Sequence, residues 1–217
     1  MIKRADKNEV LKEFEEKYVK DRHITEFEKI IEKYKTISDI VTENLVSKFN
    51  SVCKEAILLQ EKELKGEIMY IYFSILRTSI LENKGQWRID LYDEKWLLDN
   101  EECSVNIDLD FIYEPLFNHM KELSEKKKEY VHIKKSQSTT KIFQIKEKDI
   151  EYIKLREANK YHGLALNIIR DALQNFLECT SYEEMKKKED ITIMAGEYMD
   201  AAIRIRHMKE NNKSKMP

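Results

Sequence analysis

The chain has 217 residues, enough for one domain with a substantial core. Only four glycines and two prolines are present, which argues against an all-β fold because such folds need many turns. A formal net charge of −2 argues against a protein that coats nucleic acid. The 37% of charged and 41% of hydrophobic residues are typical of amphipathic helices, so composition predicts a mainly helical protein.

The cysteines and the N-terminus indicate a compartment. Cys53, Cys103 and Cys179 are odd in number, far apart and form no CxxC motif, which is typical of reduced thiols and does not fit a zinc knuckle. The first ten residues contain no apolar stretch of the kind that a signal peptide needs. We therefore expect a cytoplasmic protein with no membrane segment.

Helical periodicity dominates the first part of the chain. Val10 and Phe14 recur at helical spacing, and the same period resumes at Phe27 and continues to Leu59. Amphipathic helices of this kind bury one face on a core and leave the other in water. We expect two or three helices between residues 5 and 65.

The most apolar stretch is Glu67–Leu81, EIMYIYFSILRTSIL, which leaves almost no polar face. Its first half contains the β-branched and aromatic residues that strands favour. The run nevertheless continues without a turn residue beyond the roughly eight residues of a typical buried strand. We therefore predict a helix over about 67–83, buried on all sides and ended by Asn83 and Gly85.

Arg77 lies inside this apolar run. An unpaired buried guanidinium is very costly, so Arg77 is expected to form a structural ion pair rather than to bind a substrate anion. Several acidic residues are close enough in sequence to serve as its partner. They are Asp90, Asp93, Asp108 and Asp110.

The middle of the chain contains two segments in which apolar and polar residues alternate, at about 87–93 and about 104–110. Period 2 is typical of half-buried strands, so we predict a small antiparallel β element packed on helices. A helix is expected to begin near Pro115. Residues 130–133 and 141–145 either form a second hairpin around a polar loop or simply flank that loop.

The last part of the chain again shows helical spacing. We predict a long helix over Asp149–Glu178, a short one from Ser181 and a last helix over about Thr192–Lys209, followed by a disordered tail at 210–217. No repeat or linker divides the sequence. The predicted fold is therefore mainly α, a single domain (1–217) in which a multi-helix bundle surrounds the central helix.

An acidic block occupies residues 87–114, with nine acids against two bases, a balance of −7. If Asp90, Asp108 and Asp110 converge, their carboxylates could hold Mg²⁺ as in a metal-dependent phosphodiester hydrolase. We favour a simpler interpretation, in which the block is the solvated outer face of the strands. A third interpretation is a docking surface for a basic partner.

A lysine-rich stretch occupies residues 121–148, with nine lysines against four glutamates, a balance of +5. Tyr130, His132 and Phe143 interleave with the lysines, as in many RNA-contacting surfaces. No RNP-like or GxxG motif accompanies them, so binding of nucleic acid is not expected. The stretch either neutralises the acidic block within the molecule or is solvated.

Arg156 and His162 lie six residues apart in the predicted long helix. This spacing resembles that of the HEPN domains, helical ribonucleases with an arginine followed by four to six residues and a histidine. The resemblance implies a catalytic role for both residues. The polar residue that usually follows the arginine is replaced by Glu157, and the alternative is that His162 is a core histidine beside Ala165.

The sequence contains no zinc-binding histidine spacing, no glycine-rich phosphate loop and no nucleophile signature. The main functional hypothesis is therefore a non-enzymatic protein that acts by binding a protein partner or by self-association. A regulator, an inhibitor or an immunity-type protein would act in this way. The alternative is a metal-dependent or HEPN-like nuclease or phosphoesterase, for which Mg²⁺ is the only implied cofactor.

Overall fold

The computed structural model describes the backbone of residues 7–129, 131–135 and 140–207. The predicted tail at 210–217 lies outside these residues. A five-stranded mixed sheet is packed against helices in this part of the chain, in the strand order β3-β2-β1-β6-β7. Its strands are β1 (Ile68–Ile75), β2 (Gln86–Tyr92), β3 (Ser104–Asp108), β6 (Lys187–Glu197) and β7 (Ala202–His207).

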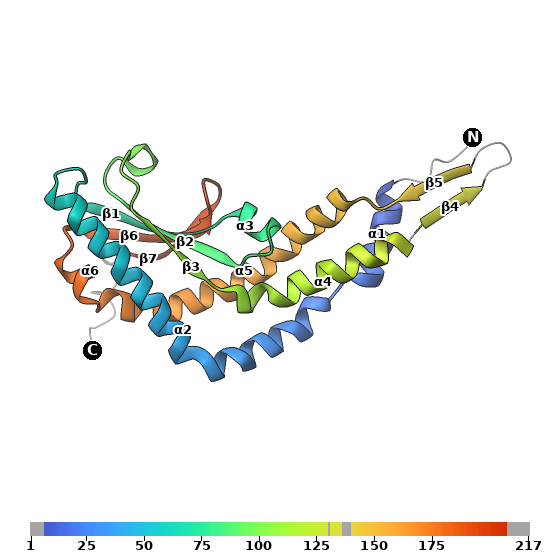
Figure 1. The fold of residues 1–217 in the computed structure, drawn as a ribbon, viewed down its shortest axis with the longest axis horizontal. Coiled ribbons are helices and arrows are strands. Elements are labelled where there is room, and N and C mark those ends of the chain that lie inside the picture. The colour runs from blue at the N-terminus through green and yellow to red at the C-terminus, as the bar shows by residue number, and fades with distance from the viewer. Residues whose placement is uncertain (1–6, 130, 136–139, 208–217) are drawn as a thin grey trace, which may run out of the picture.

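The helices cover one face of this sheet and then extend beyond it (Figure 1). They are α1 (Lys7–Tyr18), α2 (Arg22–Glu61), α3 (Arg77–Leu81), α4 (Asp110–Glu129), α5 (Glu147–Leu177) and α6 (Thr180–Glu184). A separate two-stranded hairpin, β4 (Val131–Lys135) with β5 (Thr140–Gln144), joins α4 to α5 at the far end of the molecule. No helix among the described residues is both long and apolar enough to cross a membrane.

The predicted helical bundle around a central helix is wrong, because the first half of the run at 67–83 is strand β1 (Ile68–Ile75). This strand is antiparallel to β2 on one side and parallel to β6 on the other. Leu76 separates β1 from the short α3, with φ −92° and ψ 123°. These angles lie in the extended region that any residue can adopt, so the boundary needs no glycine or proline and the sequence does not mark it. The single predicted helix therefore corresponds to two elements, β1 and α3. The two predicted strands at about 87–93 and 104–110 are β2 and β3. They pair with each other as part of the five-stranded sheet and do not form a small separate β element.

The predicted last helix at 192–209 is also wrong, because β6 and β7 form an antiparallel hairpin there. Gly196 and Ala202, both within that predicted helix, lie opposite each other across the hairpin. A Cβ atom on Gly196 would lie 2.0 Å from the carbonyl oxygen of Ala201. The small residues are therefore needed where the two strands approach each other.

The core lies between the helices and one face of the sheet. Ile71, Phe73 and Ile75 alternate along β1 and are fully or almost fully buried. The ring of Phe176 from α5 stacks on Phe73 at 5.7 Å and on Phe49 from α2 at 4.9 Å. These aromatic contacts fasten the two longest helices to the sheet.

Candidate functional site

The second face of the sheet has no long helix over it (Figure 1). Register places Tyr70 opposite Tyr92, Tyr72 opposite Asp90, and Ser74 opposite Arg88. These side chains alternate with the core residues of β1, so they belong to the face that points away from the helices. Two connections rise over this open face, the β2–β3 loop (93–103) and the β6–β7 turn (198–201).

Trp96 packs the β2–β3 loop onto the open face. Its ring lies 4.5 Å from Tyr70, 4.9 Å from Tyr92 and 5.9 Å from Tyr72. The φ of Trp96 is 54°, a left-handed conformation that bulky side chains rarely adopt and that tertiary contacts must maintain. The loop is therefore held in one conformation by the aromatic residues beneath it.

A buried ion pair provides a second anchor for the same loop. Lys65, just before β1, pairs with Asp99, and the two side chains are 0% and 1% exposed. The Lys65 ammonium also donates to the carbonyl of Glu101 at 3.0 Å. Asp93, at the start of the loop, accepts hydrogen bonds from the backbone N–H groups of Gly66 and Lys95 at 3.0 and 2.9 Å. Both ends of the loop are thus attached to the body.

The β6–β7 turn is fixed by polar contacts. The Tyr72 hydroxyl donates to the Glu197 carbonyl, and the Arg88 guanidinium lies 5.2 Å from the centre of the Tyr198 ring. Arg77 forms ion pairs with Glu197 at 2.5 Å and Asp200 at 3.2 Å. The predicted ion pair of Arg77 therefore has different partners from those expected. Its side chain is 62% exposed, because α3 lies beyond the C-terminal end of β1.

The two connections expose apolar side chains that we call the loop tips: Leu97, Leu98 and Met199. Leu98 is 83% exposed, Met199 is 65% exposed and Leu97 is 38% exposed. Two acidic residues of these connections, Glu94 and Asp200, are also exposed, and Asp200 is the residue that pairs with Arg77. Each connection thus carries exposed apolar and acidic residues and is held by the contacts above, and the strand register places the two connections at opposite ends of β1.

The acidic block does not gather its three metal-ligand candidates. Asp90 is buried and paired with Arg88 at 2.6 Å, and burial raises its pKa although Arg88 opposes that shift. Asp108 lies further along the sheet, opposite Gln86, and accepts from the backbone N–H of Asp110 at 2.7 Å. Asp110 begins α4 and accepts from the N–H of Gly85. Within the described residues, no group of three potential ligands could hold a metal ion.

Arg156 and His162 do line one pocket, which also includes Arg77 and has a volume of about 280 Å³. Both arginines already have carboxylate partners, since Arg156 pairs with Glu15 at 2.9 Å. The pocket therefore brings the sequence candidates together, but its guanidinium groups are largely neutralised.

The imidazole of His162 contacts two aromatic residues, Tyr113 and Trp87. The indole N–H of Trp87 donates to the Tyr113 hydroxyl at 3.0 Å, and this hydroxyl lies 2.8 Å from His162 Nδ1. In the tautomer with the imidazole proton on Nε2, Tyr113 accepts from Trp87 and donates to Nδ1, so that its hydroxyl proton also has a partner. Burial lowers the pKa of His162 to about 4, so the ring is neutral at pH 7 and is a weak base.

We expect His162 to make stability depend on pH. The pKa is about 4 in the folded protein and about 6.5 in the unfolded chain, which therefore gains a proton first as the pH falls. The stabilisation is complete above pH 6.5 and decreases toward pH 4. Between pH 7 and pH 5, the free energy of unfolding should fall by about 2 kcal/mol more in the wild type than in His162→Gln, measured by urea denaturation. Equal losses in the two proteins would contradict the assignment.

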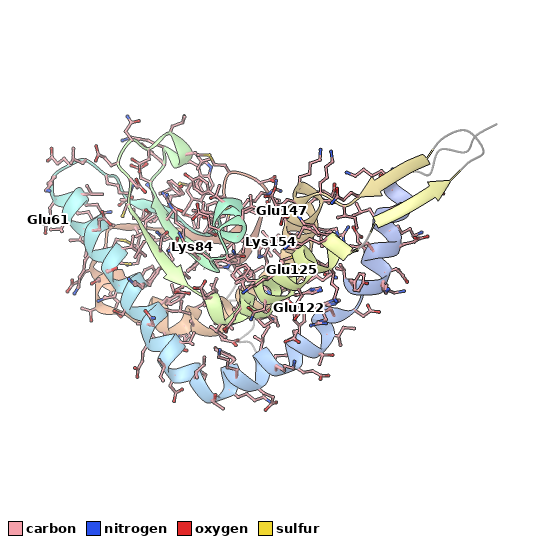
Figure 2. The ribbon with its side chains drawn as sticks, turned by 45° about the vertical axis from the view of Figure 1, so that its right-hand side comes forward. Glu61, Lys84, Glu122, Glu125, Glu147 and Lys154 are labelled. Atoms are coloured by element: carbon pink, nitrogen blue, oxygen red, sulfur yellow. The ribbon has the colours of Figure 1, made fainter. Side chains whose placement is uncertain are left out.

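The lysine-rich stretch lies away from the acidic block. Figure 1 shows the β4–β5 hairpin at the opposite end of the molecule from the β2–β3 loop, so the hairpin does not neutralise that loop. At the base of the hairpin, Lys127 pairs with Glu147 and Lys128 pairs with Glu125 at 2.9 Å. Figure 2 shows Glu125, Glu147 and Lys154 close together where α4 runs beside α5. Lysines at this base are thus paired locally.

Lys65 and Asp99 were not identified as important from the sequence. The Trp96-Leu97-Leu98 triplet in the connection predicts that this segment folds back onto the core, and Trp96 packs on the sheet whereas Leu98 is exposed. Comparison of the chain with family models, with curated proteins and with solved structures found no match in any of the three.

Proposed function

We propose that this protein acts by binding a protein partner through the loop tips on the open face of the sheet. The observation that supports the proposal is Leu98, which is 83% exposed although its loop is anchored by a buried ion pair and by Trp96. An exposed leucine on a mobile loop would need no explanation. On a fixed loop it forms a preorganised contact, which binds with a smaller loss of conformational entropy.

The chemistry of the surface suggests the chemistry of the partner. Protein interfaces commonly have an apolar centre and a polar rim. Here Leu97 and Leu98 of the β2–β3 loop provide exposed apolar groups, and Glu94 of the same loop provides an exposed acidic group. The partner surface that fits has basic residues around an apolar patch. This matches the interpretation of the acidic block as a docking surface, although Asp90, Asp93 and Asp99 serve the fold instead.

The proposal is tested by removing the apolar tips. We expect Leu97→Ser/Leu98→Ser to reduce partner recovery at least about ten-fold in affinity capture from an extract of the source cells, quantified by mass spectrometry. Ile40→Ser is the matched control, because Ile40 is 69% exposed on α2. Equal recovery by the wild type and both variants would contradict the proposal, as would the absence of any specifically captured protein.

The class of protein proposed is an intracellular regulator, inhibitor or immunity-type protein. Its three cysteines without a CxxC motif support a cytoplasmic location. Self-association is the other form of protein binding that the same surface allows. Light scattering after size-exclusion chromatography distinguishes the two, since a dimer lost in the Leu97→Ser/Leu98→Ser variant identifies a second copy as the partner.

The pocket with Arg156 and His162 supports a second candidate, a phosphoesterase or nuclease. Nε2 of His162 could donate to a phosphate oxygen, but the pKa of about 4 makes this imidazole a weak general base at pH 7. If the pocket is catalytic, the wild type should cleave single-stranded RNA in Mg²⁺ buffer, and His162→Gln should be at least about 100-fold slower. Intact RNA after incubation with the wild type would contradict this candidate.

A further inference from the structure

A second pocket, with a volume of about 460 Å³, lies where α4 runs beside α5. Its walls come from these two helices and from the end of α3, and it shares no lining residue with the pocket that contains His162. The volume is within the range of small-molecule sites in proteins. Figure 2 shows three of its lining residues, Glu125, Glu147 and Lys154, close together.

Lys154 is the buried charged group of this pocket. Its side chain belongs to a residue that is only 6% exposed. The ammonium donates to the Leu81 carbonyl at 2.9 Å and to Oδ1 of Asn83 at 2.8 Å. The same nitrogen lies 5.2 Å from the centre of the Phe117 ring. An ammonium has three N–H donors, and these contacts provide oxygen acceptors for two of them.

The positive charge of Lys154 is not balanced by a negative group in contact with it. Within the residues that the structure describes, no carboxylate pairs with this ammonium, and both of its oxygen acceptors are neutral. Burial lowers the pKa of Lys154, although Glu151 opposes that shift. Lys65, which is also buried, pairs instead with Asp99. Buried charges are normally paired, so Lys154 lacks the anion that Lys65 has.

The other lining residues restrict the anion that could fill this role. Apolar side chains form part of the wall, namely Phe117, Met120 and Ile150. Glu125, Glu147 and Glu151 also line the pocket, and the first two already pair with lysines outside it. These carboxylates repel a dianion such as phosphate more strongly than a monoanion. The ligand that fits has one negative charge on an apolar body.

We propose that this pocket binds a small organic carboxylate, whose anionic group pairs with the Lys154 ammonium and whose apolar part contacts Phe117. The carboxylate supplies the charge and the third acceptor that the described residues do not provide. Asn83 can add a hydrogen bond, because its Oδ1 accepts from Lys154 and its amide N–H groups remain as donors. This site does not depend on partner binding at the loop tips.

The alternative is that Lys154 only joins α5 to α3. Leu81 is the last residue of α3, and carbonyls at a helix end have no partner within the helix. The bond from Lys154 satisfies this carbonyl. A purely structural lysine predicts lower stability when it is replaced but no affinity for a carboxylate, so a binding measurement separates the two roles.

The first test uses the wild-type protein and requires no substitution. Benzoate and hexanoate are the probes, their neutral amides benzamide and hexanamide are the controls, and binding is followed by NMR titration at pH 7. We expect saturable binding of at least one carboxylate, at least about ten-fold tighter than that of its amide, because the amide lacks the charge that pairs with Lys154. No binding of either carboxylate, equal binding of acid and amide, or tighter binding of inorganic phosphate would overturn the proposal.

A pair of variants tests the position of the site. Lys154→Met keeps an unbranched side chain and removes the charge, and we expect it to weaken carboxylate binding at least about ten-fold. Lys148→Met is the matched control, since Lys148 is an exposed lysine of α5 that does not line the pocket. Its affinity should stay within about two-fold of the wild type, because exposed charges are screened by solvent and salt.

Circular dichroism establishes whether Lys154→Met is folded, and a measurement on the wild type replaces it if it is not. During the titration, the backbone amide resonances of residues 117–124 and 150–154 should shift with the same affinity. Undiminished binding by folded Lys154→Met would overturn the proposal. Shifts confined to residues 155–162, beside the pocket that contains His162, would also overturn it.

Discussion

Replacing Lys65 with methionine should lower the free energy of unfolding by about 3–5 kcal/mol at pH 7. The side chains of Lys65 and Asp99 are 0% and 1% exposed, so the variant leaves a carboxylate buried without its counter-charge. It also removes the hydrogen bond from Lys65 to the Glu101 carbonyl. Urea denaturation followed by far-UV circular dichroism measures the loss.

A double variant separates the charge from the packing. Lys65→Met/Asp99→Asn retains the side-chain oxygen that accepts from the N–H of Glu101 at 3.0 Å, but removes the unpaired charge. It should recover most of the stability that Lys65→Met loses. Lys35→Met is the control, because Lys35 and its partner Glu32 are both exposed, and no measurable change is expected. A single variant as stable as the wild type would contradict the buried pair.

The same variant connects stability with the proposed function. If the Lys65–Asp99 pair holds the β2–β3 loop, Lys65→Met should weaken partner capture even where the protein remains folded. The loss arises because a released loop must be ordered again on binding. Undiminished capture by folded Lys65→Met would show that the loop does not need this anchor.

Truncating Phe176 to alanine should also cost about 3–5 kcal/mol of the free energy of unfolding. Phe176 is fully buried and stacks on Phe73 of β1 and Phe49 of α2, so its removal opens a cavity between the sheet and both long helices. Thermal and urea denaturation should both show the decrease. The effect is larger than that of a surface change because neighbouring elements can close the cavity only in part.

The matched control for Phe176 is Ile40→Ala on α2. Ile40 is 69% exposed, so its truncation should change stability by no more than about 0.5 kcal/mol. A cost below about 1 kcal/mol for Phe176→Ala would mean that the aromatic stack is not the contact that joins the layers.

The functional candidates were only partly accessible from sequence. The Arg156–His162 spacing correctly placed both residues on one helix, and they line one pocket, but Glu15 and Tyr113 come from distant segments. The HEPN resemblance implies a helical domain, whereas the sheet makes this protein α/β. The acidic block was visible as charge, but its sequence gave no sign that Asp99 is paired inside the protein with Lys65.

Local sequence pattern by itself determined the amphipathic helices that became α1 and α5 and the alternation in β2, because each depends on the spacing of apolar residues within one segment. It did not determine whether Ile68–Ile75 is a strand or a helix. A strand is completed by hydrogen bonds from other strands, and β6, which pairs with β1, is far along the chain. Only the tertiary structure therefore decided the sheet and the open face with its loop tips.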